Sequence, residues 1–304
     1  MAGLKKFPKL LRLPYLALKN VILHMGPMEI INLSLTSIRS KRFIKLVIPK
    51  QTAKLKVWYG QKGTIELSYN GLKLCFEYKS VPDTNQCLDF LCYIFNCIIH
   101  STHFSEQYCP GHVNMVVDWL NSRQKSIEYS SIDAFGMKKE ELRKALHNLL
   151  HIKQEFFYEC TKIHNMQPIE LPLGMKILRG GDLFPSFTID NILKSNCEVI
   201  SISNHHYPFT AMDMNKFLRG WIRGDIPNLK LFDVCTDLLD EESMLEGIKA
   251  TRSVGTVMAD CQHKDYKNYR INDGMEIRGD NAIATFEYSS DCFKMLVTSN
   301  GELF

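Results

Sequence analysis

The side chains that could do chemistry are histidines and cysteines in scattered groups. The densest group is His100, His103, Cys109 and His112, four potential zinc ligands within thirteen residues. Zinc needs four nitrogen or sulfur donors in a tetrahedron, and paired spacings of this kind can supply them. Their order matches no common zinc finger, however. We therefore favour a surface loop with a buried cysteine, and we expect neither a metal nor another cofactor.

The remaining histidine and cysteine groups do not favour catalysis. His147 and His151 are four residues apart on an expected helix, but the glutamate that accompanies such a pair in zinc hydrolases is missing. Cys87, Cys92 and Cys97 recur every five residues, which rotates each by about 140° from the last on a helix, so they cannot share one metal-binding face. The chain also lacks the phosphate-loop, dinucleotide-binding and nucleophile-elbow motifs. We expect a protein without enzymatic activity.

Composition narrows the class of protein further. The 304 residues include ten cysteines, too few for a disulfide scaffold and without a Cys-x-x-Cys pair, which is typical of reduced thiols. The longest apolar stretch, residues 91–99, is about half of the ~20 residues that cross a membrane. We expect no membrane association and an intracellular protein, located in the cytoplasm, the nucleus or both.

Charge is distributed unevenly along the chain. The first sixty residues hold twelve Lys and Arg against one acidic residue, Glu29, whereas the whole chain has a net charge of only +4. The remainder is therefore acidic. A basic arm ahead of an acidic body indicates an acidic partner for the arm, either a nucleic acid or an acidic protein.

Three short helices are expected within this basic arm. Pro14 suits the first turn of a helix that continues to Met25, and Gly26-Pro27 ends this helix and begins the next. The second helix is apolar on most sides, and a third, basic helix covers residues 37–46. So few residues cannot enclose this much apolar surface, so the rest of the chain or a partner protein must cover it.

These residues resemble an F-box, the three-helix motif by which substrate receptors bind the adaptor of a cullin–RING (SCF-type) ubiquitin ligase. The resemblance rests on the run Leu13, Pro14, Val21, Ile22, Met25, Ile30, Ile31, Asn32, Leu33 and Ser34. Three positions depart from the usual motif: Leu16 stands where many F-boxes have an acidic residue, Thr36 where Val is usual and Ser40 where Trp is common.

The resemblance implies a set of adaptor-binding residues and a set of partners. The residues expected at or under the adaptor surface are Leu13, Pro14, Leu18, Val21, Ile22, Met25, Pro27, Ile30, Ile31 and Leu33. The implied partners are the SCF adaptor, the cullin bound to it, and a target protein whose identity leaves no motif. Helices in an apolar groove would provide the contact, with aliphatic anchors contributing most of the affinity.

Beyond residue 46 the pattern changes to strands with helices between them. Strands are expected at 55–59, 64–69 and 72–76, with an Asn70-Gly71 hairpin turn, and a helix is expected over 87–100. Further strands begin near 127, 155, 176, 199 and 229, with helices over 138–150 and 211–222. This spacing suits a leucine-rich-repeat-like α/β stack, and a compact α/β domain explains it almost as well.

The clearest local sequence lies in the helix over 211–222. Met214, Phe217, Leu218, Trp221 and Ile222 form a complete apolar stripe, which predicts a core helix. This region is similar to the type 2 F-box-associated region, whose recurring feature is Asn-x-Phe-Leu-x-x-Trp-Ile-x-Gly before a leucine-rich strand. The order of the two resemblances along the chain also matches that family, which is greatly expanded in nematodes.

Together these patterns predict an α+β or α/β protein that begins with a three-helix F-box. We expect the F-box at 8–46, a connecting β/α segment at 47–112 and a repeat-like α/β substrate-facing domain at 113–304. Within that last domain, residues 187–253 resemble the associated region, and the tail forms a closing β-meander. His205 and His206 precede the core helix and are candidates for a substrate-binding surface, with an ordinary polar turn as the alternative.

The predicted function is that of a substrate-recognition subunit of an SCF-type ubiquitin ligase. The N-terminal helices would bind the adaptor, and the α/β body would hold the target. Two alternatives stay open. The basic first sixty residues could bind nucleic acid, although aromatic stacking residues are sparse there, so nucleic acid is the less favoured partner. The chain could also be an F-box scaffold that works outside any ligase.

Overall fold

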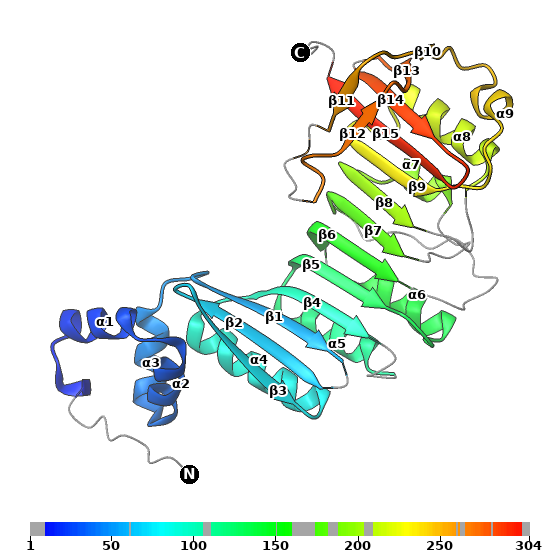
Figure 1. Cartoon of the computed structure of the whole chain (residues 1–304). Coiled ribbons are helices and arrows are strands. Elements are labelled where there is room, and N and C mark those ends of the chain that lie inside the picture. The colour runs from blue at the N-terminus through cyan, green and yellow to red at the C-terminus, as the bar shows by residue number, and fades with distance from the viewer. Residues whose placement is uncertain are drawn as a thin grey trace. The chain divides into compact units, whose positions relative to one another are not determined.

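The computed structural model describes residues 10–60, 62–105, 111–149, 151–159, 174–181, 188–203, 209–259, 261, 265–280 and 282–299. They belong to two compact units, residues 1–112 and 113–304 (Figure 1). Each unit contains helices packed beside a β-sheet.

The first unit begins with the expected helices. A 3₁₀ turn, Leu10–Arg12, precedes α1 (Tyr15–His24), α2 (Pro27–Leu35) and α3 (Ile38–Val47). The Gly26 N–H at the start of α2 donates to the Glu29 carboxylate at 2.9 Å, and Ser37 caps α3 by accepting the Ser40 N–H at 3.0 Å. These contacts satisfy backbone donors that have no partner within the helix, so the helix boundaries follow from the local sequence.

Among its described residues, the rest of the first unit contributes four strands and one helix. Its strands lie in the order β4-β1-β2-β3, and β1 pairs with β4 in parallel and with β2 antiparallel. The hairpin turn is confirmed, because Asn70 and Gly71 both have positive φ, at 50° and 77°, as a mirror-image two-residue turn requires. The elements are β1 (Ala53–Tyr59), β2 (Gly63–Tyr69), β3 (Leu72–Tyr78), α4 (Val81–Phe95) and β4 (Ile99–Ser105).

The helix predicted over residues 87–100 has the wrong bounds, because α4 covers Val81–Phe95. It begins earlier, because the Ser80 side chain accepts the Asp83 N–H at 3.2 Å and Pro82 occupies its first turn, where a missing N–H costs nothing. It ends earlier, because Asn96 adopts a left-handed conformation with φ 49°. Residues from Ile99 onwards then form β4.

The second unit contains five parallel strands that follow one another in chain order, β5 to β9. Helix α5 packs beside α6 and α7 beside α8, and Figure 1 shows these helices along one face of the strands. The order agrees with the succession of strands and helices expected of a stack. The elements are α5 (Val113–Arg123), β5 (Ser126–Asp133), α6 (Lys139–Asn148), β6 (His151–Glu159), β7 (Ile177–Gly181), α7 (Ile189–Leu193), β8 (Val199–Ser203), α8 (Ala211–Ile222) and β9 (Leu231–Cys235).

The chain ends in the predicted antiparallel meander. Strand β15 pairs with β14 and also with β9, so it joins the meander to the parallel strands. Strands β11 and β12 form a separate pair. The elements are α9 (Glu241–Leu245), β10 (Thr251–Arg252), β11 (Thr256–Met258), β12 (Arg270–Asn272), β13 (Met275–Arg278), β14 (Ala282–Tyr288) and β15 (Cys292–Ser299).

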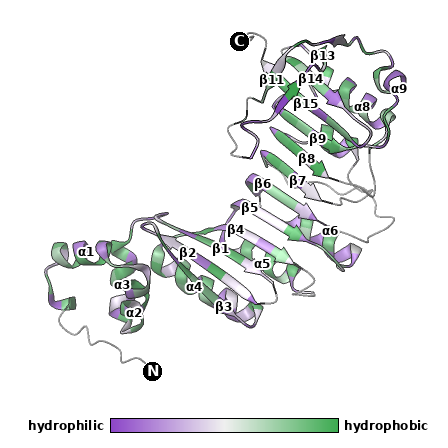
Figure 2. Cartoon of the chain, in the orientation of Figure 1, coloured by the Kyte–Doolittle hydropathy of each residue, from purple (hydrophilic) through white to green (hydrophobic). Residues whose placement is uncertain are grey.

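Apolar side chains lie on both faces of the later parallel strands. Strands β8 and β9 are strongly hydrophobic (Figure 2), and most of their residues are buried. Residues of the segment that contains β11 and β12 pack onto these strands and cover part of their second face. This cluster consists of Ile177, Val199, Leu231, Ala259, Cys261, Tyr266, Ile271 and Leu296.

Helix α8 has the predicted core stripe. Met214, Phe217, Leu218 and Trp221 are buried, and Ile222 is half-buried. The exposed side of the helix carries charge.

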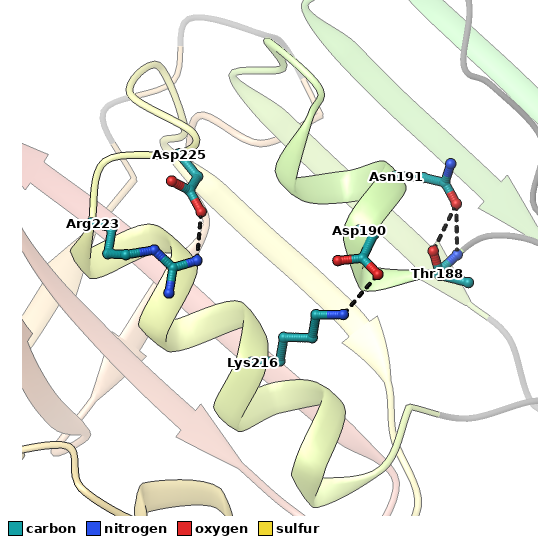
Figure 3. A network of polar contacts seen from close by, with 6 residues as sticks. All are labelled: Thr188, Asp190, Asn191, Lys216, Arg223 and Asp225. Carbon is teal, nitrogen blue, oxygen red and sulfur yellow. Dashed lines mark hydrogen bonds and ion pairs between the residues drawn. The ribbon is translucent and has the colours of Figure 1, made fainter.

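Polar contacts join α8 to its surroundings. The Lys216 ammonium lies 2.7 Å from the Asp190 carboxylate on α7, and Arg223 pairs with Asp225 just after the helix (Figure 3). These ion pairs are exposed, so buried apolar area is the main contribution that holds α8 in place.

Replacing Thr210 by Ala should destabilise the second unit by about 1 kcal/mol. The Thr210 side chain accepts the Asp213 N–H at 3.2 Å, and the Asp213 carboxylate accepts the Thr210 N–H at 3.0 Å, a reciprocal cap at the start of α8. Urea unfolding measures the effect. A Thr210→Ser variant, which keeps the hydroxyl, should retain most of the stability, and equal losses in both variants would contradict the capping role.

Candidate functional site

The N-terminal helices have a core of their own. Leu18, Ile22, Ile30, Leu33 and Ile44 are all buried within the first unit. They come from α1, α2 and α3, so the apolar stripes of the three helices meet. These buried side chains stabilise the arrangement of the three helices and are not accessible to a partner protein.

A second set of apolar side chains on the same helices faces outward. Leu16 is 70% exposed, Leu35 65%, Ile38 73% and Leu46 77%. Single exposed apolar residues are ordinary, whereas contiguous apolar patches are typical of interaction surfaces. Of the eighteen exposed large apolar residues among those that the structure describes, eight lie on these helices or next to them: Leu13, Tyr15, Leu16, Val21, Met28, Leu35, Ile38 and Leu46.

The structure divides the ten residues expected at or under the adaptor surface. Leu13, Pro14 and Val21 are exposed, and Met25 is half-buried. The other six are buried and shape the helical module from within: Leu18, Ile22, Pro27, Ile30, Ile31 and Leu33. The predicted adaptor-binding set did not include the exposed residues Leu16, Leu35, Ile38 and Leu46.

Ser40, at the position where Trp is common in F-boxes, is held by hydrogen bonds to neighbouring side chains. Ser40 is fully buried on α3, and its hydroxyl lies 2.8 Å from the Ser37 hydroxyl and 3.0 Å from the Thr36 hydroxyl. Thr36 also donates to the Leu33 carbonyl at 2.8 Å. A small hydrogen-bonded cluster therefore joins α2 to α3 at the point where two of the three departures from the usual motif occur.

The helical module is attached to the rest of the first unit. The Lys41 ammonium lies 5.1 Å from the centre of the Phe90 ring and 5.0 Å from that of Tyr93, and Lys45 lies 4.0 Å from Tyr93. The Asn70 side chain of the hairpin turn donates to the Leu23 carbonyl at 3.2 Å. Two basic residues of the N-terminal arm thus contact aromatic rings of α4.

A double-mutant cycle should detect the contact between Lys45 and Tyr93. We expect a coupling energy of about 0.5–1 kcal/mol between Lys45→Met and Tyr93→Leu, because an ammonium over an aromatic face is stabilising by that amount. Urea unfolding of the wild type, both single variants and the double variant gives the value. A coupling indistinguishable from zero would mean that this pair contributes nothing to holding α3 against α4.

Among the described residues, the histidine and cysteine side chains do not form a metal site. His147 lies on α6 but His151 begins β6, so the two are not on one helix as expected. Within the described ranges, no three His, Cys, Asp or Glu side chains are close enough to hold a metal ion. Cys109, His205 and His206 lie outside the described residues.

The buried thiols are held in the protonated form. Burial raises the pKa of Cys197 to about 11, and a hydrogen bond with Cys92 together with burial raises the pKa of Cys97. Because the thiolate is the nucleophile, both thiols are unreactive near neutral pH. Among the helices described, none has the length and apolarity needed to cross a bilayer.

Comparison with known families identifies the N-terminal helices and the region around α8. The family model of the F-box domain matches residues 10–52, and a second model, described as F-box associated, matches residues 163–234. The chain contains an F-box domain and an F-box-associated region. The F-box match covers α1 to α3, and the associated match includes β7, α7, β8 and α8. No curated protein and no solved structure matches the chain.

The family matches bear on the predictions in two ways. Both modules that the sequence resembled are present, in the predicted order. The associated model matches residues 163–234, which overlaps the predicted region 187–253, and the predicted domain bounds stay a prediction. Neither match is to a leucine-rich repeat, so that description of the body stays a prediction. F-box and F-box-associated domains are typical of receptor subunits without catalytic activity, and F-box domains generally bind the adaptors of SCF complexes.

Proposed function

We propose that this protein is the substrate-recognition subunit of an SCF-type ubiquitin ligase. The observation that carries the proposal is the set of exposed apolar residues on an otherwise well-packed F-box. Leu16 and Ile38 are each about 70% exposed in the free protein. An adaptor with a complementary apolar groove would bury them.

The buried and exposed residues of the F-box have different roles in this proposal. Leu13, Pro14 and Val21 contact the adaptor directly, together with the exposed Leu16. The buried residues of the expected set hold α1, α2 and α3 in the geometry that presents these contacts. Hydrophobic burial at the contact contributes about 25 cal/mol per Å² of apolar surface, and the preformed helices avoid the entropy cost of ordering a flexible segment.

The second unit would bind the target protein, and the ligase would act by proximity. Holding a target beside a ubiquitin-loaded enzyme raises its effective concentration, so the receptor itself needs no reacting group.

Reconstitution tests the proposal. The full chain, co-expressed with an SCF adaptor and a cullin, should co-purify with both, and affinity purification with mass spectrometry should then report target proteins. Failure to retain the adaptor would overturn the proposal. Retention of the adaptor without ubiquitination of any co-purifying protein would instead indicate a scaffold outside the ligase. Salt-sensitive retention of the chain on nucleic acid would favour the basic-arm alternative.

A further inference from the structure

Two cysteines lie directly opposite each other where the parallel strands meet the closing meander. Cys235 is the last residue of β9, Cys292 is the first residue of β15, and the two are register partners in the antiparallel pair. Neither cysteine belongs to a disulfide, and both are half-buried. The side chains of directly opposed residues in a β-ladder lie on the same face of the sheet, so these thiols are neighbours.

The hydrogen bonding around the pair defines its geometry. The Thr236 N–H donates to the Asp291 carbonyl at 3.1 Å, so these two residues occupy a hydrogen-bonded position of the ladder. Hydrogen-bonded and non-hydrogen-bonded positions alternate, which puts Cys235 and Cys292 at a non-hydrogen-bonded position. There Cα atoms are about 4.5 Å apart, inside the range of about 4.4–6.8 Å that disulfides span. The pair can therefore close without a rearrangement of the backbone.

We propose that Cys235 and Cys292 form an oxidative modification site, at which a hydroperoxide converts the two thiols into an intrachain disulfide. One thiolate attacks the peroxide oxygen, and the O–O bond breaks to leave a sulfenic acid. The second thiol attacks that sulfur, the S–S bond forms, and hydroxide leaves as water after taking up the proton of the thiol. With hydrogen peroxide the balance is two thiols and one peroxide giving one disulfide and two waters.

The surroundings of the pair suit a reversible covalent link. The Ser289 hydroxyl donates to the Asp291 carboxylate at 2.9 Å and lies 3.0 Å from the Cys292 sulfur, so its oxygen can accept the Cys292 thiol proton. On the same face, Asp233 is the next residue of β9 and accepts the Tyr269 hydroxyl at 2.6 Å, which holds the segment after β11 against the sheet. A disulfide here would join the last parallel strand covalently to the meander, in the region just after the F-box-associated match.

A peptide map of the full-length protein tests the proposal directly. Trypsin releases residues 231–249 and 279–294, and each of these peptides contains one cysteine. Reduced protein is treated with hydrogen peroxide, its remaining thiols are blocked with N-ethylmaleimide, and it is digested without reduction. We expect more than half of both peptides to appear as one cross-linked species lighter than their sum by two hydrogens, at a yield independent of protein concentration.

Matched variants and a stability measurement complete the test. Cys292→Ser should abolish the cross-linked species, whereas Cys75→Ser, which removes an exposed thiol on β3, should leave it unchanged. The disulfide would close the loop between Cys235 and Cys292. It should therefore raise the melting temperature by roughly 5–10 °C, and dithiothreitol should reverse the shift. The proposal would be overturned if both peptides were recovered with their cysteines alkylated while other thiols were oxidised. It would also be overturned if Cys235 paired equally with other cysteines. The wild-type map decides the matter even if a variant fails to fold.

Discussion

Replacing Leu13 and Leu16 together by aspartate should weaken binding of the SCF adaptor at least about 100-fold. These side chains are 40% and 70% exposed in the free protein, so their replacement removes apolar anchors without opening a cavity in the F-box core. In the complex the two carboxylates would have to leave water for an apolar groove, and a 100-fold loss corresponds to only about 2.7 kcal/mol. Calorimetric titration of the full chain with purified adaptor measures the change.

The matched control introduces two aspartates in place of exposed apolar residues of the second unit. Leu238→Asp combined with Val254→Asp replaces two residues that are 80% and 93% exposed in the second unit, and it should leave adaptor affinity within about twofold of the wild type. Both double variants should melt within a few degrees of the wild type. An affinity of the Leu13 and Leu16 variant that stays within threefold of the wild type would show that the adaptor does not contact the start of α1.

Replacing Phe217 by Ala should destabilise the second unit by about 3–5 kcal/mol. The Phe217 side chain is fully buried on α8, and its ring stacks on that of Phe232 in β9 with 3.9 Å between the ring centres. Truncation leaves a cavity between helix and sheet and also removes the aromatic contact. For a unit of this size the loss should lower the melting temperature by roughly 6–20 °C, which differential scanning calorimetry can measure.

The same helix provides the control. Met212 lies in the first turn of α8 and is 78% exposed, so Met212→Ala should change the free energy of unfolding by no more than about 0.5 kcal/mol. If Phe217→Ala cost less than about 1 kcal/mol, the stripe on α8 would not be part of the core. The interpretation of the family's Phe-Leu-x-x-Trp-Ile pattern as a structural feature would then be wrong.

Much of the local structure was determined by the sequence alone. The start of α8 follows from the cap formed by Thr210 and Asp213, and its length follows from the apolar stripe. The hairpin between β2 and β3 follows from Asn70-Gly71, whose residues tolerate positive φ. The F-box itself was recognisable because its spacing of apolar residues is a local property of three consecutive helices. In each case the deciding interactions join residues only a few positions apart.

Other features were decided only by the tertiary structure. The sequence did not distinguish the buried Ile31 from the exposed Leu35 on α2, since both are aliphatic and the difference depends on what the rest of the first unit covers. It did not place Lys45 over the Tyr93 ring, nor Cys235 opposite Cys292. Burial and strand register depend on contacts between distant segments, and the residue types at single positions carry no information about those contacts until the chain has folded.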